Sequence, residues 1–177
     1  RDRVVEGDGE VILGDTGVKL MSKIHQLCSG TVKFESGIAM TVDFSKVNFI
    51  KKYFKNKKIA IFYKFTQEYK ALKEIYKEEL TNDLEEFKTT DKSIALQIVA
   101  GREGVSLKEA EALVYYNIDF SATSYFQSRD RMTTKDRAYN KIYWIFSNKG
   151  IEADIYKAVV KKKDYTLSHF KRDSLDL

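Results

Sequence analysis

Short apolar stretches alternate with amphipathic ones along most of the chain, and this alternation restricts the fold more than any other feature. The run 58–63 is apolar and bounded by polar residues, which indicates a buried β-strand, and residues 67–79 then carry apolar side chains at helical spacing. The same order recurs, with strands expected at 93–99, 113–117 and 141–146 and helices at 107–112, 123–131 and 151–162. Alternating strands and helices form mostly parallel sheets with helices on both faces. The sequence therefore predicts an α/β fold.

The first third of the chain predicts two helices and a hairpin. Apolar residues repeat at helical spacing over 18–28, and Gly30 supplies a stop. Residues 31–34 and 38–42 flank a short loop that contains a glycine, which is typical of a β-hairpin. Ser45 is expected to cap a further helix that runs to about residue 56.

The length of 177 residues favours one folded domain. Residues 1–17 contain glycines and acids with little periodicity, so we expect a linker or a frayed segment there. The domain itself is expected to span 18–166, and 167–177 is expected to be a C-terminal tail. Because the sequence begins with Arg1 and not with a methionine, we expect a piece of a larger protein.

The net charge and the number of cysteines limit which partners and which cellular compartment we expect. A net charge of +5 and a pI near 9.0 permit a polyanionic partner without requiring one. Cys28 is the only cysteine, so the chain can form no internal disulfide and no thiolate zinc site, and we expect no metal site and a reducing cytoplasm. No run of about 18 apolar residues occurs, which predicts a protein without a membrane partner.

A glycine-containing turn follows the expected strand at 93–99. Gly101 and Gly104 let the backbone approach a phosphate closely, and a helix that begins at Ser106 would aim its amide groups at an anion. The same segment, 106–109, also matches a capping box, in which Ser106 would serve only its own helix. Both interpretations stay open from the residues alone.

Ligands of open α/β sheets bind at the carboxyl ends of the strands. Lys64 and Thr66 must lie there, directly after the expected strand at 58–63. Thr66 is equally suited to cap the helix that follows, and Lys64 can be a solvated charge at a strand end.

Gln127, Asp130 and Arg131 are spaced three and four residues apart, so they would share one face of a helix and could converge on one bound group. The planar guanidinium of an arginine suits such a position because it binds phosphate oxygens through two donors and stays charged. Two simpler interpretations remain: 124–127 could be another capping box, and Arg129 with Arg131 could be a plain basic face.

Several of these segments together resemble the second RecA-like lobe of superfamily 2 helicases, particularly the Swi/Snf-like branch with its bacterial and phage members. The resemblance covers about residues 18–162. It is carried by Gln26 on the first helix and by Lys58-Ile59-Ala60-Ile61-Phe62-Tyr63-Lys64-Phe65-Thr66, Ala100-Gly101-Arg102-Glu103-Gly104-Val105-Ser106-Leu107, Ala110-Glu111-Ala112-Leu113-Val114-Tyr115-Tyr116, Asp119, Gln127-Ser128-Arg129-Asp130-Arg131 and Gly150-Ile151-Glu152. In that family they correspond to motifs IV, V and VI and to the closing helix, which implies a RecA-like C-terminal lobe.

The resemblance implies roles for individual residues. Arg131 is expected to face the phosphates of ATP held by the other lobe, and Gln127 is expected to support that catalytic site. The residues expected to bind ATP are Gly101, Glu103, Gly104, Asp130, Arg131 and Lys135. The residues expected to contact the DNA backbone are Lys64, Thr66, Arg102 and Ser106.

The sequence departs from the family pattern at two places. Thr134 stands where the second arginine of motif VI is expected, so either the neighbouring Lys135 or a realigned Arg129 replaces it, or hydrolysis is weak. The tryptophan usual near Asp119 is also absent, and Phe120 is the nearest aromatic residue.

The sequence lacks the phosphate-binding loop that the first lobe of such an ATPase supplies. A phosphate-binding loop needs the form G-x-x-x-x-G-K-[ST], and the nearest approach, at residues 9–16, has Asp15 in place of the lysine. ATP and Mg²⁺ would therefore be bound mainly by a first lobe, and we expect the 177-residue chain alone not to hydrolyse ATP. The expected partners are DNA, contacted without regard to base sequence, and the N-terminal lobe of the same parent chain.

Two alternatives belong to other classes. A binding module for nucleic acid or protein, with no motor partner, would use the basic run Lys161-Lys162-Lys163 and the aromatic surface. A separate phosphate-binding α/β enzyme lacks a convincing nucleophile or base, since His25 is expected to be a buried helix residue and His169 a tail residue.

Overall fold

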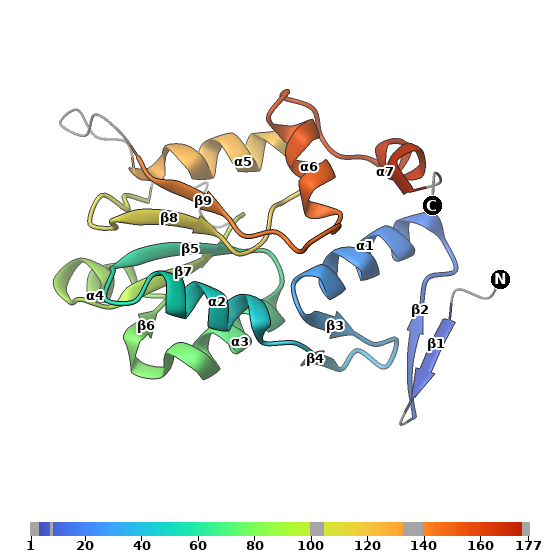
Figure 1. Cartoon of the computed structure of the whole chain (residues 1–177), viewed down its shortest axis with the longest axis horizontal. Helices are drawn as coiled ribbons and strands as arrows, with labels where there is room; N and C mark the ends of the chain where they lie inside the picture. Colours follow the sequence, from blue (N-terminus) through green and yellow to red (C-terminus); the bar gives the residue numbers. More distant parts are fainter. Residues whose placement is uncertain (1–3, 8, 100–104, 133–139, 175–177) are drawn as a thin grey trace.

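A computed structural model describes residues 4–7, 9–99, 105–132 and 140–174. Five parallel strands form the central sheet, in the order β6-β7-β5-β8-β9 (Figure 1). These strands are β5 (Ile59–Tyr63), β6 (Leu80–Thr81), β7 (Ser93–Gln97), β8 (Ala112–Tyr115) and β9 (Ile142–Trp144). The predicted parallel sheet is confirmed, and four of its strands lie where the sequence places them.

Helices cover both faces of this sheet, because alternate residues of each strand point to opposite sides. Ile59 and Ile61 of β5 pack into a cluster with α2 and α3, whereas Ala60 and Phe62 pack into the cluster on the other face, with α4, α5 and α6. The bounds are α2 (Ser45–Tyr53), α3 (Thr66–Tyr76), α4 (Leu84–Thr89), α5 (Ala122–Arg129) and α6 (Glu152–Val159). Strands that are apolar on both sides belong in the middle of such a three-layer arrangement.

The N-terminal helix α1 (Gly17–Cys28) and the hairpin of β3 (Thr31–Lys33) and β4 (Ala39–Thr41) follow the prediction. Gly30 has a φ of +77° and lies so close to Asp43 that a β-carbon would come within 2.2 Å of the Asp43 carbonyl oxygen. Only glycine fits this position, which explains why the helix ends there.

Near both ends of the chain, described residues form regular elements that the sequence does not predict. A hairpin of β1 (Val4–Gly7) and β2 (Glu10–Leu13) occupies the segment expected to be a linker or a frayed strand. The amide of Glu35 donates to the Val11 carbonyl at 3.0 Å, and this bond fastens the hairpin to the β3–β4 loop. The expected tail forms α7 (Leu167–Ser174), which contacts α1 and buries Phe170. The domain limits at 18 and 166 themselves stay a prediction.

One expected helix was wrong, and two short elements were not expected. The helix expected at 107–112 is absent, because this segment bonds to other parts of the chain: the amide of Leu107 donates to the Arg131 carbonyl at 3.0 Å, and that of Glu111 donates to the Lys58 carbonyl at 2.8 Å. Strand β6 and helix α4 were not expected, because each is too short to show a clear periodicity of apolar residues in the sequence.

Candidate functional site

The loops after β5 and β8 meet at the carboxyl edge of the sheet, where Lys64 and Asp119 form an ion pair. Their side chains are only 19% and 11% exposed, and the Lys64 ammonium also lies 4.7 Å from the centre of the Phe120 ring. Burial alone would raise the pKa of Asp119, but the charge of Lys64 and hydrogen bonds to the carboxylate lower it below its usual value. Lys64 is thus held by Asp119 at the edge where we expected it to contact DNA.

A second polar group lies beside this ion pair and joins three elements. The Nε2 of His25, on α1, lies 2.5 Å from the Oδ1 of Asn117, and the Nδ2 of Asn117 donates to the Oε1 of Glu68, on α3, at 2.5 Å. Because the Asn117 oxygen also accepts from the Ile118 amide at 2.8 Å, it is an acceptor and His25 Nε2 carries the proton. All three side chains are fully buried.

His25 is neutral in this arrangement. Burial lowers its pKa to about 3, and the nearby charges of Lys64 and Lys46 act in the same direction. Its Nδ1 is buried and has no hydrogen-bond partner among the described residues. The expectation that His25 is a buried helix residue is confirmed, whereas its link to a loop 92 positions away has no signal in the sequence.

Glu68 performs the role that we considered for Thr66. Its Oε2 accepts from the amides of Lys64 and Phe65 at 2.7 and 2.9 Å, so it satisfies donors at the start of α3. The residue before the helix is Phe65, and Thr66 is its first residue, with an exposed side chain. The capping role of Thr66 was therefore wrong. Burial raises the pKa of Glu68 despite these hydrogen bonds.

The described segment that follows Gly104 in the sequence lies next to the end of α5. The Leu107–Arg131 backbone bond joins the two, and the Arg131 side chain is half-buried there. Residues 105–111 lead to the amino end of β8 without forming a helix. Ser106 is exposed in this connection, and no helix begins there. The expected roles of Ser106 as a helix cap and at a helix end were therefore wrong, and its contact with DNA stays a prediction.

Gln127 is exposed on α5, and Asp130 is exposed with an oxygen 3.6 Å from the Nε of Arg129. The α-helix ends at Arg129, and a 3₁₀ turn (Asp130–Met132) follows, so Arg131 does not continue the helical face of Gln127. The cap of α5 is Ser121, whose hydroxyl accepts from the Ser124 amide at 3.3 Å, and the alternative capping box at 124–127 was wrong.

The structure separates the candidate residues into two places. Lys64 and Thr66 lie at the carboxyl edge, whereas α5 begins beside that edge and runs back along the sheet, so that Arg131 lies at its far end (Figure 1). The candidates Gly101, Arg102, Glu103, Gly104 and Lys135 lie outside the described residues.

The chain is similar in fold to solved structures. No family model matches the chain, and no curated protein does. Among solved structures, the C-terminal part of the Fun30 ATPase domain is similar in fold, with a TM-score of 0.58 and 18% identity. The chain has the fold of a RecA-like lobe. The match covers 73% of this chain, which spans about half of that structure.

The described residues also bear on metals, membranes and the motif at residues 9–16. No group of three or more His, Cys, Asp or Glu side chains among them could hold a metal ion. None of their helices is long and apolar enough to cross a bilayer. Residues 10–13 form the strand β2 and not a phosphate-binding loop, so this segment supplies no ATP site of its own.

Proposed function

We propose that the chain is the C-terminal lobe of an ATP-dependent DNA helicase or translocase. The observation that carries the proposal is the RecA-like fold shared with the C-terminal part of an ATPase domain. The backbone bond between Leu107 and Arg131 supports it, because it joins the end of the segment that resembles motif V to the arginine expected to reach ATP.

In this proposal Arg131 faces the phosphates of ATP from across the cleft between two lobes, and Gln127 supports that site. The first lobe would make most of the contacts to ATP and Mg²⁺, and transfer of the γ-phosphoryl group from the ADP leaving group to water would drive movement. The guanidinium of Arg131 can donate to two phosphate oxygens and stays charged as negative charge develops. Its half-buried position suits this role, because part of the side chain is already fixed by the protein.

Closure of the cleft would shift the DNA contacts by one step. Thr66 has an exposed hydroxyl at the carboxyl edge and can donate to a backbone phosphate. Lys64 can reach a phosphate only if it leaves Asp119, so we propose that it acts by exchanging one anion for another. Such contacts ignore base sequence, and binding should weaken as salt is raised.

The test uses a protein that contains both lobes. Arg131→Ala should lower DNA-stimulated ATP hydrolysis by at least about a hundredfold, since arginines in this role contribute about 10³ to 10⁵ in rate. DNA affinity, measured by fluorescence anisotropy, should change less than about twofold. Arg172→Ala, which removes an exposed arginine from α7, is the matched control and should leave both quantities unchanged.

A normal rate in the Arg131→Ala protein would contradict the role of Arg131. The 177-residue chain by itself should not hydrolyse ATP, with or without DNA. Robust hydrolysis by the isolated chain, in a preparation free of contaminating ATPases, would contradict the proposal that this chain supplies only part of an ATP site. A parent chain that contains no phosphate-binding loop would instead favour the binding module without a motor.

A further inference from the structure

A lysine-rich segment leads from the end of α2 into β5. Residues 51–58 contain five lysines and no acidic residue. Two of the five are tied to the protein: Lys51 donates to Glu79 at 2.9 Å and to the Ile75 carbonyl at 3.0 Å, and Lys58 donates to the Thr90 carbonyl at 2.6 Å. These two ammonium groups stabilise the fold.

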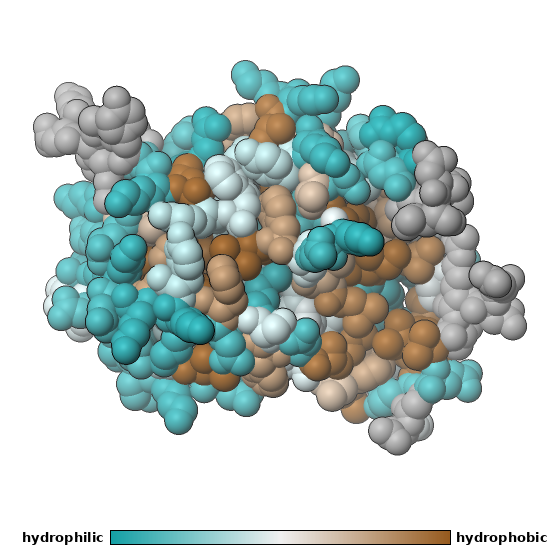
Figure 2. Space-filling view, viewed as in Figure 1, coloured by the Kyte–Doolittle hydropathy of each residue, from teal (hydrophilic) through white to brown (hydrophobic). Residues whose placement is uncertain are grey.

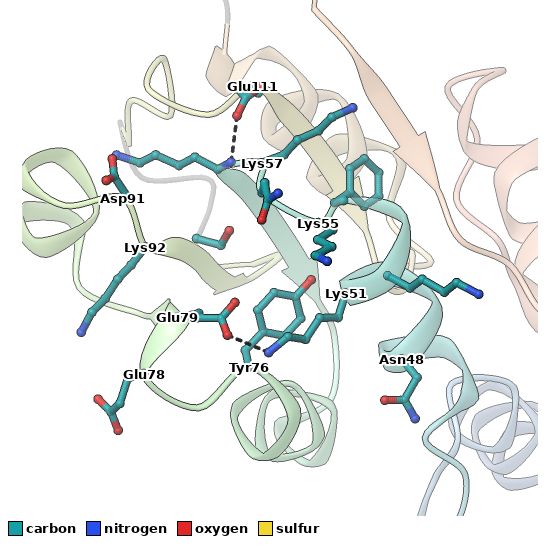
Figure 3. Close-up of a pocket in the computed structure, with 15 residues that line it drawn as sticks. Asn48, Lys51, Lys55, Lys57, Tyr76, Glu78, Glu79, Asp91, Lys92 and Glu111 are labelled. Carbon is teal, nitrogen blue, oxygen red and sulfur yellow. Dashed lines mark hydrogen bonds and ion pairs between the residues drawn. The ribbon is translucent and has the colours of Figure 1, made fainter.

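The other three lysines have no such role. Lys52, Lys55 and Lys57 are exposed and form no ion pair within the part of the chain that the structure describes. All three line a groove of about 1020 Å³ between the end of α2 and the loops before β6 and β7, where Figure 3 labels Lys55 and Lys57. Three like charges held within six residues repel one another, so a polyanion that reaches all three would be stabilised there.

The acidic residues of this groove lie on the wall opposite α2. Glu79 is paired with Lys51, and the Glu111 carboxylate accepts from the amide of Lys58 at 2.9 Å, so both are already engaged (Figure 3). Glu78 and Asp91 also line that wall. A phosphate backbone is therefore disfavoured deep in the groove and favoured along the outer side of α2.

Two aromatic rings continue the lysine surface along α2. Phe49 and Tyr53 are one helical turn apart, 50% and 54% exposed, and stacked with ring centres 5.6 Å apart at 20°. Tyr53 also contacts the edge of the Tyr143 ring on β9, at 5.9 Å, which fixes its orientation. Large apolar rings that remain half-exposed beside lysines provide both a stacking surface and a charge.

Figure 2 shows how hydrophobic and hydrophilic residues are distributed on one face of the molecule. Hydrophobic residues gather over α1, β2 and the β3–β4 hairpin, whereas hydrophilic residues crowd the other side of the same face, around the end of α2. Because residues 54–58 lead from α2 into the amino end of β5, Lys55 and Lys57 lie at the opposite end of this strand from Lys64 and Thr66.

We propose that Lys52, Lys55 and Lys57, with the stacked rings of Phe49 and Tyr53, form a binding surface for single-stranded nucleic acid. Lysines that follow the phosphates and aromatic rings that stack on unpaired bases are the two features that such binding needs. A duplex keeps its bases stacked internally and cannot use the rings. This surface requires neither ATP nor a first lobe, so it goes beyond the proposed function and does not depend on it.

The experiment measures binding of a fluorescein-labelled oligothymidylate of about 20 nucleotides to the full 177-residue chain by anisotropy. The triple change Lys52→Gln, Lys55→Gln and Lys57→Gln should weaken binding at least about tenfold. The slope of log affinity against log salt should fall by about 2, since each phosphate contact on a single strand contributes about 0.7. The matched control replaces Lys161, Lys162 and Lys163 by glutamine, with the same change in charge, and should weaken binding less than about twofold.

The rings give a second, independent measurement. Phe49→Ala with Tyr53→Ala should weaken binding roughly five- to tenfold and leave the salt slope unchanged, because stacking releases no counterions. Phe49→Tyr with Tyr53→Phe should bind as the wild type does. A duplex of the same length should bind more weakly and should not respond to the ring changes.

Crosslinking covers the case in which the ring variant fails to fold. An oligonucleotide that carries 5-bromouracil, irradiated on the wild-type chain, should crosslink to the peptide that contains Phe49 and Tyr53. Crosslinks confined to other peptides would overturn the proposal. So would absence of binding, equal losses in the two lysine triples, or equally effective competition by polyglutamate, which would indicate an acidic protein partner.

The result also separates this inference from the proposed function. If both triple lysine variants bind the oligonucleotide as well as the wild type does, the proposal of a binding surface on α2 is wrong. The proposed contacts at the carboxyl edge would be unaffected by that result. A normal rate of ATP hydrolysis in the Arg131→Ala protein would contradict the proposed role of Arg131 and leave the α2 surface unaffected.

Discussion

At position 25 an imidazole is enclosed between the rings of Phe65 and Phe120, with ring centres 5.3 and 4.8 Å away, and donates to Asn117. Protonation would place a charge in this site next to the ammonium of Lys64. The folded protein therefore binds the neutral form, while the unfolded chain takes up a proton near pH 6.5.

This difference predicts a loss of stability in acid. Between about pH 6.5 and about pH 3 the unfolded state binds one more proton at His25 than the folded state, so the contribution is intact above pH 6.5 and is lost as the pH falls. At pH 5 the loss amounts to about 2 kcal/mol. Urea denaturation at pH 7 and pH 5 measures it.

His25→Gln should flatten this dependence, because glutamine can donate to Asn117 and does not titrate. Glu68, whose pKa is raised by burial, acts in the opposite direction in the same range, since its folded form holds a proton to higher pH. The comparison of variant with wild type cancels that contribution. His169→Gln, at the only other histidine, is the control. An equal pH dependence in wild type and His25→Gln would contradict the assignment.

For single residues, the sequence indicates which side chains are buried but not which of them form hydrogen bonds with one another. The helical spacing of α1 places His25 on its apolar face, yet nothing in the sequence links it to Asn117 or Glu68. Such pairs depend on how α1 lies against the carboxyl edge, which is a property of the whole fold.

Between elements, one buried ion pair joins both faces of the sheet. The ammonium of Lys46, on α2, lies 2.7 Å from Glu152 Oε1, on α6, and donates to the Tyr116 carbonyl after β8 at 3.1 Å. The two side chains are 7% and 0% exposed. Each charge is therefore tolerated only because the other is present.

Lys46→Met should lower the free energy of unfolding by about 3 to 5 kcal/mol, because it leaves the Glu152 carboxylate buried without its partner. The double change Lys46→Met with Glu152→Met should lose much less, since no charge is left unpaired. Urea denaturation of the wild type, the two single variants Lys46→Met and Glu152→Met, and the double variant gives the coupling energy. A single variant within about 1 kcal/mol of wild type would show that the pair is not coupled.

Element prediction succeeded where an apolar pattern is long. Strand β5 and helix α1 have such patterns, and both lie where expected. The segment 107–112 shows the opposite case: its apolar residues Leu107 and Ala110 have helical spacing, but they enter the core from a turn. Local spacing cannot distinguish these two cases, because the backbone partners come from distant strands.

At the scale of the molecule, the C-terminal helix belongs to the core that the rest of the chain forms. Phe170 is 4% exposed and belongs to the same apolar cluster as Met21 of α1 and Tyr165. Only Leu167 and Phe170 are apolar in α7 before its end, which is too few for periodicity to reveal.

Phe170→Ala should lower the free energy of unfolding by about 3 to 5 kcal/mol, the usual cost of removing a buried phenylalanine. Lys171→Ala, at the exposed neighbour, should change it by less than about 0.5 kcal/mol. Thermal unfolding followed by circular dichroism measures both. A Phe170→Ala protein as stable as wild type would mean that 167–177 is a tail, as the sequence first suggested.

Both outermost strands of the sheet are very short, since β6 has two residues and β9 has three. A neighbouring molecule that tried to extend the sheet would find only a few free amide and carbonyl groups on either side, too few to template a further strand. The protein should consequently remain dispersed at the high concentrations that binding titrations require, instead of polymerising edge to edge.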